Sequence, residues 1–330
     1  MKIVKNAYYD QFRCIADRCP DSCCKEWNVL VDETSAALYR SLPGDLGNRL
    51  RQVLTDKDNR TYMTIENGRC PMWRTDSLCR IQAELGEAAL CQTCRDFPRL
   101  THDYGDFVEY TLELSCPEVA RILLNSPHQP PGVTHTSGGE APEYDREAMA
   151  ILLGSREQMY DILSSNRPVS EALALGLLYA YQIQAELDGA EPVAFDPDAA
   201  LETAQAMGSP CNHEQLVSFY QGLDILTKEW KSRLDAPSPA PWSEPLRQLA
   251  IYGVERYWLQ AVSDYDLAGR AKMVMLSCLL VKALGGDPVE TAQMYSKEIE
   301  NNADNIDAIL DAAYENPDFT DDKLLFLLIH

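Results

Sequence analysis

Nine of the eleven cysteines in this 330-residue chain lie between residues 14 and 116, and this concentration constrains the chain more than any other feature. They are Cys14, Cys19, Cys23, Cys24, Cys70, Cys79, Cys91, Cys94 and Cys116, whereas Cys211 and Cys278 lie outside. Thiolates gathered this densely suit zinc or an iron–sulfur cluster. The competing chemistry is disulfide bonding, and the redox state of the compartment decides between the two.

The sequence favours a reducing compartment. Its N-terminus, MKIVKNAYYDQFRC, lacks the apolar segment and small-residue cleavage site of a secretory signal peptide. No stretch reaches the roughly 18 consecutive apolar residues that a membrane-spanning helix requires. We therefore expect a cytoplasmic protein with reduced thiols, in which the nine clustered cysteines are candidate metal ligands. Inert buried thiols are the alternative.

The acidic residues are concentrated in the second part of the chain. The formal net charge is −22; residues 1–124 carry 16 Lys and Arg against 19 Asp and Glu, whereas residues 125–330 carry 13 against 32. Such a surface repels nucleic acid and anionic membranes, so we expect neither as a partner. It is compatible with a lysine-bearing protein partner, although a merely solvated acidic surface is the ordinary interpretation.

A change in composition predicts the domain organisation. Residues 125–142 include seven Pro or Gly, which is typical of a linker. We therefore expect a mainly α protein with a small cysteine-rich, metal- or cluster-binding domain over residues 1–124. A helical domain is expected over residues 143–330, because apolar residues there recur with helical spacing.

The expected secondary structure places the cysteines in loops and at helix ends. Alternation and β-branched residues predict a strand over 61–66, a second strand over 107–114 and a short extended segment over 27–31. A helix over 80–95 would place Cys91 and Cys94 on one face. In the second part we expect helices over 143–163, 170–188, 197–207, 212–235, 244–262, 264–284, 288–300, 303–314 and 320–329.

Cysteine spacing leaves the metal open. Zinc ribbons usually pair two C-x2–4-C units, whereas Cys91-x2-Cys94 is the one C-x2-C unit here. The C-x2-C-x2-C-x3-C run of bacterial ferredoxins is absent. The C-x3-C-x2-C run of radical enzymes begins at Cys19-x3-Cys23, but Glu26 occupies its third position. Zinc and an iron–sulfur cluster therefore both remain candidates for this chain.

Several short motifs in this stretch resemble those of one family. They are Cys14, Cys19, Cys23-Cys24, Trp27, Cys70, Leu78-Cys79-x-Ile81, Leu85-Gly86-Glu87, Leu90-Cys91-x2-Cys94, Phe97-Pro98-Arg99 and Ser115-Cys116-Pro117-Glu118. In this order they resemble the flagellin lysine-N-methylases, within the wider CxxCxxCC group of zinc- or iron-chelating domains. The resemblance covers about residues 8–124, whereas the acidic second part resembles the family only in being helical.

The resemblance implies a protein-lysine N-methyltransferase acting on flagellin or a similar protein. It implies S-adenosylmethionine as the methyl donor and a 4Fe-4S cluster held by the cysteines, with zinc as the alternative. A non-catalytic zinc- or iron-binding module, used for partner docking or metal handling, is the competing function. The residue pattern alone identifies no catalytic and no donor-binding residue.

Methyl transfer from a sulfonium donor requires groups that stabilise a cation, and aromatic rings and carboxylates do so. The aromatic candidates near the cysteines are Tyr8, Tyr9, Trp27, Trp73, Tyr104 and Tyr110, and the acidic candidates are Asp17, Asp21, Glu26, Glu109 and Glu118. Arg95 and Arg99 are candidates for binding the donor carboxylate, and His102 is a candidate base. Core packing, helix capping and solvation are the alternative roles.

Overall fold

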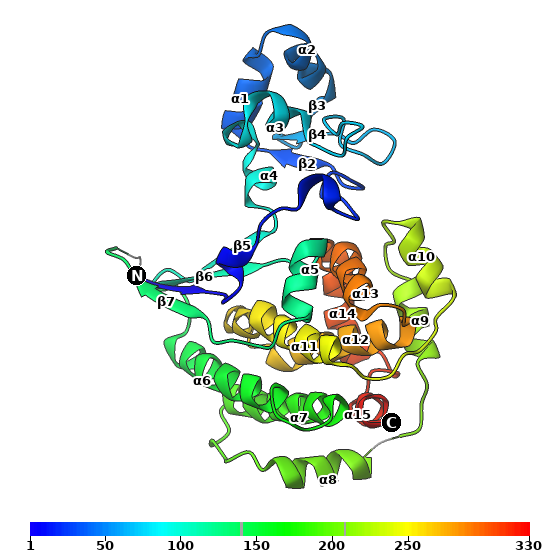
Figure 1. The fold of residues 1–330 in the computed structure, drawn as a ribbon. Helices are drawn as coiled ribbons and strands as arrows, with labels where there is room; N and C mark the ends of the chain where they lie inside the picture. Colours follow the sequence, from blue (N-terminus) through cyan, green and yellow to red (C-terminus); the bar gives the residue numbers. More distant parts are fainter. Residues whose placement is uncertain (139–140, 208) are drawn as a thin grey trace.

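The computed structural model describes residues 1–138, 141–207 and 209–330, and helices dominate these ranges (Figure 1). Fifteen α-helices occur among the described residues, which confirms the prediction of a mainly α protein. They are α1 (Glu33–Ser41), α2 (Gly44–Val53), α3 (Arg80–Leu85), α4 (Gln92–Asp96), α5 (Pro117–Leu124), α6 (Arg146–Leu163), α7 (Val169–Leu187), α8 (Pro197–Met207), α9 (Glu214–Gln221), α10 (Lys228–Asp235), α11 (Glu244–Tyr257), α12 (Leu267–Leu284), α13 (Pro288–Tyr295), α14 (Ala303–Glu315) and α15 (Asp321–Ile329).

Seven strands form two sheets within the described ranges. They are β1 (Lys2–Lys5), β2 (Val29–Val31), β3 (Leu54–Lys57), β4 (Arg60–Met63), β5 (Arg99–Asp103), β6 (Phe107–Leu112) and β7 (Gly132–His135). One sheet has the strand order β5-β6-β1-β7, and the other has the order β2-β4-β3. Because β1 pairs in parallel with β6, the N-terminus lies beside the segment that leads to Cys116.

The strands predicted from alternation are present, but shorter than expected. β4 overlaps the predicted strand 61–66 over residues 61–63, β6 lies in 107–114 and β2 in 27–31. The sequence pattern did not predict strands β1, β3, β5 and β7. β7 falls inside the predicted linker, where its four exposed residues pair with β1 and carry no apolar alternation.

The single helix predicted over 80–95 is wrong, because the chain breaks at Gly86. Helix α3 ends at Leu85, and Gly86 follows with a φ of 87°, a left-handed conformation that glycine adopts without strain. A short 3-10 turn, Glu87–Ala89, and the extended Cys91 then precede α4. The predicted helix 212–235 is likewise two helices, since Thr227 caps a new start at α10 by accepting from the backbone N–H of Trp230.

Buried side chains form two separate clusters. The larger cluster surrounds α12, which is buried on almost every side, as expected for a helix that is apolar all round. Helices α7, α11, α13 and α14 pack around it. The smaller cluster lies among β2, β4 and α1–α3, and it contains Tyr39, Leu50, Met72, Cys70 and Cys91.

The predicted cysteine-rich stretch contributes to both clusters. Its ends pack into the larger cluster through Val4, Phe12 and Leu112, and α5 lies against α11 and α13 (Figure 1). Among the residues that the structure describes, the buried side chains of the smaller cluster all lie between Val29 and Cys91. The proposed division at residues 125–142 stays a prediction. None of the described helices combines the length and the apolar character required to cross a membrane.

Candidate functional site

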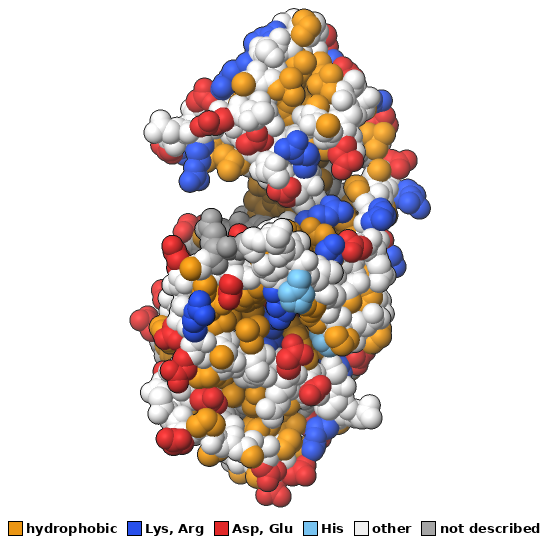
Figure 2. Space-filling view, turned by 90° about the vertical axis from the view of Figure 1, so that its left-hand side faces the viewer, with side chains coloured by type: hydrophobic (Ala, Val, Ile, Leu, Met, Phe, Trp, Pro, Cys, Tyr) orange, Lys and Arg blue, Asp and Glu red, His pale blue; other side chains and the backbone are white. Residues whose placement is uncertain are grey.

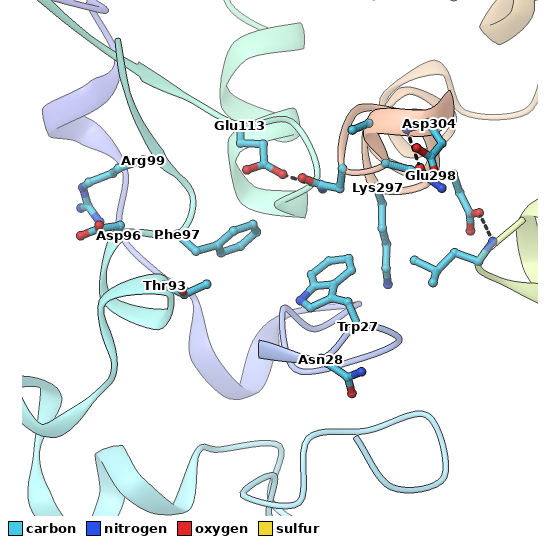
Figure 3. Close-up of a pocket in the computed structure, with 14 residues that line it drawn as sticks. Trp27, Asn28, Thr93, Asp96, Phe97, Arg99, Glu113, Lys297, Glu298 and Asp304 are labelled. Carbon is cyan, nitrogen blue, oxygen red and sulfur yellow. Dashed lines mark hydrogen bonds between the residues drawn. The ribbon is translucent and has the colours of Figure 1, made fainter. Parts of the chain in front are cut away.

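A cavity of about 610 Å³ lies between the cysteine-bearing part of the chain and the helical body (Figure 3). We call it the Trp27 cavity. One wall comes from the loop after Cys24 and from α4, and the opposite wall comes from the chain after α13 and the start of α14. Figure 2 shows the molecular surface narrowing between the part that carries α1–α4 and the helical body.

Two aromatic rings and one lysine meet at this cavity. Figure 3 shows the Phe97 ring and the Lys297 side chain both directed toward the Trp27 indole. The Nζ atom of Lys297 lies 5.4 Å from the centre of the Trp27 ring. Aromatic faces attract cations at this distance, so the cavity already holds one cation–aromatic contact.

Carboxylates and an arginine complete the lining. Glu113 is buried, and its Oε1 accepts hydrogen bonds from Asn301 Nδ2 at 2.7 Å and from the Ser115 hydroxyl. Asp96 and Arg99 lie on the α4 side of the cavity. A cationic ligand with its own carboxylate would therefore meet charges of both signs here.

Lys297 is held in place from two directions. It lies in a π-helical turn, Ser296–Glu300, that continues α13, and it is only 5% exposed. Its Nζ forms an ion pair with Asp21 Oδ2 at 2.8 Å. Burial opposes ionisation of Asp21, but the hydrogen bond from Lys297 prevails and lowers the pKa of this carboxyl below its usual value. Such widened helical turns occur frequently at functional sites.

A second cavity, of about 670 Å³, shares Lys297 and Glu298 with the first. We call it the Asp21 cavity. Glu298 is buried, and it accepts hydrogen bonds from the Leu226 backbone N–H at 2.7 Å and from the Thr227 hydroxyl. Burial raises the pKa of Glu298 in spite of these bonds. The two cavities are thus neighbours that share one wall.

The structure brings four of the predicted ligands to the smaller buried cluster. Cys70 and Cys91 belong to it, and Cys24 and Cys79 pack against it. The Cys70 backbone N–H donates to the Cys24 carbonyl at 2.7 Å, and the Cys24 thiol also interacts with that of Cys70. Hydrogen bonding between Cys91 and Cys94 lowers the pKa of Cys91 to about 7. The thiols of Cys24 and Cys70, which are distant in sequence, therefore meet.

Cys14, Cys19 and Cys116 lie near one another at the start of α5, whereas Cys23 hydrogen-bonds to Cys24. Cys116 precedes α5, is buried in the larger cluster, and has its pKa raised to about 11 by burial. The nearby Cys19 and Cys14 thiols add to this shift. Hydrogen bonding with Cys24 is the largest cause that raises the pKa of Cys23, and Cys14 and Cys116 add to it. All eleven cysteines are free thiols. Over the described ranges, no group of three or more His, Cys, Asp or Glu side chains is arranged as a metal site.

Of the other candidates, Trp27 and Arg99 line the Trp27 cavity, whereas Asp21, Glu26 and Glu118 line the Asp21 cavity. The chain turns at Glu26, whose φ is 75°, so neighbouring side chains reach different cavities.

The structure gives the remaining candidates other surroundings. The Tyr8 hydroxyl donates to the Pro127 carbonyl at 2.6 Å, and Tyr104 stacks on Phe107 with ring centres 4.6 Å apart. Glu109 forms a buried bidentate ion pair with Arg156 at 2.6 and 3.0 Å. The partly buried His102 has its pKa lowered by burial. Their contacts favour packing roles.

Tyr9 lies beside Tyr110, with ring centres 5.7 Å apart. Trp73 lies under Arg69, with 4.0 Å between the guanidinium carbon and the ring centre. Arg95 donates to the Ala88 carbonyl, and Asp17 is exposed. None of these residues lines either cavity among the described residues.

Sequence reasoning missed Phe97, Glu113, Lys297, Glu298 and Asn301 as site residues. Phe97 was noted only as part of a motif, and Lys297 and Glu298 fall within an expected helix. A lysine and a glutamate in an acidic helical segment carry no local signal of burial. Only their packing against Asp21, Trp27 and the Thr227 loop distinguishes them.

Comparison with known proteins gives three informative similarities. The Flagellar biosynthetic protein FliU of Salmonella muenchen is 31% identical over 167 residues, which cover 48% of this chain and 95% of FliU. Proteins named Lysine-N-methylase from Salmonella typhimurium and Salmonella choleraesuis are each 35% identical over 132 residues. These matches cover 38% of this chain and only 33% of either Lysine-N-methylase. No family model matches the chain. No solved structure matches it significantly.

Proposed function

Because the chain belongs to the flagellin lysine-N-methylase family, we propose that it is a protein-lysine N-methyltransferase. The proposed methyl donor is S-adenosylmethionine, and the proposed acceptor is a lysine of flagellin or a similar protein. The observation that carries the proposal is the Trp27 cavity, which combines aromatic faces, carboxylates and an arginine beside the cysteines.

The Trp27 cavity suits the donor in size and chemistry. Its volume of about 610 Å³ lies within the roughly 300–1,000 Å³ that small-molecule sites occupy. Trp27 and Phe97 offer faces for the adenine ring and for the sulfonium cation. Glu113 and Asp96 supply negative charge for the donor's cationic groups, and Arg99 supplies a partner for its carboxylate.

Methyl transfer makes few demands beyond placement. The lone pair of a neutral lysine amine forms the new N–C bond while the C–S bond of the donor breaks, leaving a neutral thioether. The amine must first lose its proton, which burial favours because it disfavours the charged form. The roles of these side chains are therefore to orient donor and amine and to exclude water.

We further propose that cysteines among Cys14, Cys19, Cys23, Cys24, Cys70, Cys79, Cys91, Cys94 and Cys116 hold a 4Fe-4S cluster, with zinc as the alternative. Support comes from the chemistry of the donor set, because Cys24, Cys70, Cys79 and Cys91 belong to or pack against the smaller buried cluster and thiolate sulfur is the usual ligand of iron–sulfur clusters. When bound, the metal group would cross-link segments that are distant in the sequence and so stabilise the fold. Free thiols throughout also fit the proposed cytoplasmic location.

The same observations motivate a proposed unit of residues 1–124 as the cysteine-rich, cluster-binding part, with residues 143–330 as the helical part. Support comes from the separate apolar cluster that Val29 to Cys91 build around Cys70 and Cys91. The Trp27 cavity then lies where the two proposed units meet, since Thr93 comes from one and Lys297 from the other.

The test compares Cys24→Ala with the matched control Cys211→Ala in anaerobically purified protein. Absorption at about 400 nm, iron content, donor binding by calorimetry and lysine mass shifts on flagellin are measured. We expect Cys24→Ala to lose all four properties and Cys211→Ala to retain them, because Cys24 contacts Cys70 while Cys211 lies elsewhere, beside Lys323.

Three outcomes would redirect the proposal. If the wild-type protein is colourless and contains zinc, the proposed metal group is zinc and not an iron–sulfur cluster. Metal binding without donor binding or methylation would favour the non-catalytic metal-binding module. Methylation that appears only with a reductant would contradict simple displacement at the amine.

A further inference from the structure

The Asp21 cavity adjoins the proposed donor site but differs from it in charge. Its lining contains seven carboxylate residues and three cationic residues. The cations are already neutralised within the cavity, because Lys25 and Lys297 pair with Asp21 at 3.2 and 2.8 Å, and Arg121 pairs with Glu118 at 2.7 Å.

Besides the hydrogen-bonded Glu298, three carboxylates of the cavity have no cationic partner in the part of the chain that the structure describes. Among the described residues, neither Glu26, Glu229 nor Asp287 forms an ion pair, although Asp287 caps α13 through the Val289 and Glu290 backbone N–H groups. Glu26 is half-buried, whereas the other two are exposed. An incoming cation would therefore be attracted, and an incoming anion repelled.

The rest of the lining is apolar. Ile15, Pro117, Val289 and Met294 contribute hydrophobic surface between the charged groups. A lysine side chain has the matching character, since its methylene stem packs on apolar surface while its ammonium group stays with carboxylates or water.

We infer that the Asp21 cavity binds the lysine-bearing segment of the acceptor protein, next to the donor in the Trp27 cavity. This inference rests on the proposed lysine methylation, and it identifies the acceptor class as segments without acidic residues beside the target lysine. The shared residues Lys297 and Glu298 place the two ligands on either side of one wall. Lys297 and Glu298 are therefore the residues that separate a target amine in the Asp21 cavity from the donor.

The fixed position of Lys297 adds to selectivity. Its ammonium group is held by Asp21 and Trp27, so it repels a second cation that approaches the Trp27 cavity directly. A neutral amine is not subject to this electrostatic repulsion. The wall therefore favours the neutral form of the target lysine, which is the form that displacement requires.

The experiment measures binding of synthetic peptides to the full-length protein by calorimetry, with the donor product S-adenosylhomocysteine present. The first peptide carries one lysine between glycines and serines, the second carries norleucine in its place, and the third has aspartates beside the lysine. We expect the first peptide to bind most tightly and its affinity to fall with added salt.

The protein variant is the double substitution Glu26→Gln and Glu229→Gln, with Glu202→Gln on α8 as its control. Removing two partly exposed charges should weaken lysine-peptide binding about three- to tenfold, while the control binds like wild type. Absorption at about 400 nm and the melting temperature check that the variant is intact.

Equal affinity for the lysine and norleucine peptides, or unchanged peptide affinity in the double variant, would overturn the inference. If the proposed function is wrong, the result is different: the wild type methylates no acceptor, although it still binds peptides in a charge-dependent way. Conversely, a wild type that methylates lysine, with the same KM for peptide in the double variant, would contradict only the inference about the Asp21 cavity.

Discussion

The carboxyl group of Glu255 lies in surroundings that oppose its ionisation. Burial raises its pKa to about 7, although the Asn6 amide, at 2.7 and 2.8 Å, and the nearby Arg156 favour the charged form. Glu109 adds repulsion. Between about pH 4.5 and pH 7, Glu255 is therefore protonated in the folded protein but ionised in the unfolded chain. Because unfolding releases this proton, the free energy of unfolding falls as the pH rises through this interval.

Replacing Glu255 by Gln should remove this pH dependence, because an amide does not ionise. Between pH 4.5 and pH 8, the free energy of unfolding should fall by about 3 kcal/mol less in the variant than in the wild type. Urea unfolding at several pH values measures the difference, with Glu202→Gln as the exposed control. Parallel pH profiles of wild type and Glu255→Gln would show that the carboxyl is ionised throughout.

At the scale of elements, the close approach of α11 and α12 depends on Gly253. A Cβ atom at this position would lie 2.7 Å from Cγ2 of Val274, inside the packed core. Gly154 on α6 has no atom within 4 Å of the equivalent position, and it therefore provides a matched control.

The two glycines should respond to alanine with opposite signs. Gly253→Ala should destabilise the protein by about 1–3 kcal/mol through overpacking, whereas Gly154→Ala should stabilise it by about 0.5–1 kcal/mol through its helix propensity. Chemical denaturation of the two variants measures both changes. A stable Gly253→Ala protein would mean that the helices separate at little cost.

At the scale of the whole molecule, the N-terminal stretch and the helical body share one core. Helix α5 buries Val119, Ala120, Leu123 and Leu124 against α11 and α13. A fragment of residues 143–330 lacks this apolar face, so its own core is left partly uncovered.

The fragment 143–330 should keep a helical circular dichroism spectrum and bind neither iron nor zinc. Its melting temperature should lie about 10 °C or more below that of the full chain, because the loss of several buried side chains costs several kcal/mol. A fragment of residues 113–330 restores α5 and should melt higher. Equal melting of both fragments would show that α5 contributes little.

Local patterns in the sequence determined much of the secondary structure. Helical spacing predicted α6, α7, α8 and α14 within a few residues, and β-branched alternation predicted β4 and β6. These elements follow from contacts between near neighbours in the chain, which a short window of sequence contains. The dense cysteines and their motifs, likewise visible without a structure, indicated the family to which the comparisons assign the chain.

Tertiary structure decided which distant residues meet. Cys24 lies beside Cys70, and Trp27 lies beside Lys297, but no periodicity links either pair. The break at Gly86 and the exposed strand β7 also escaped prediction, because a left-handed residue and an unpatterned edge strand leave no apolar signal. Both cavities arise where the loop after Cys24 packs against the π-helical turn at Lys297, and such long-range packing is fixed by the whole core rather than by local sequence.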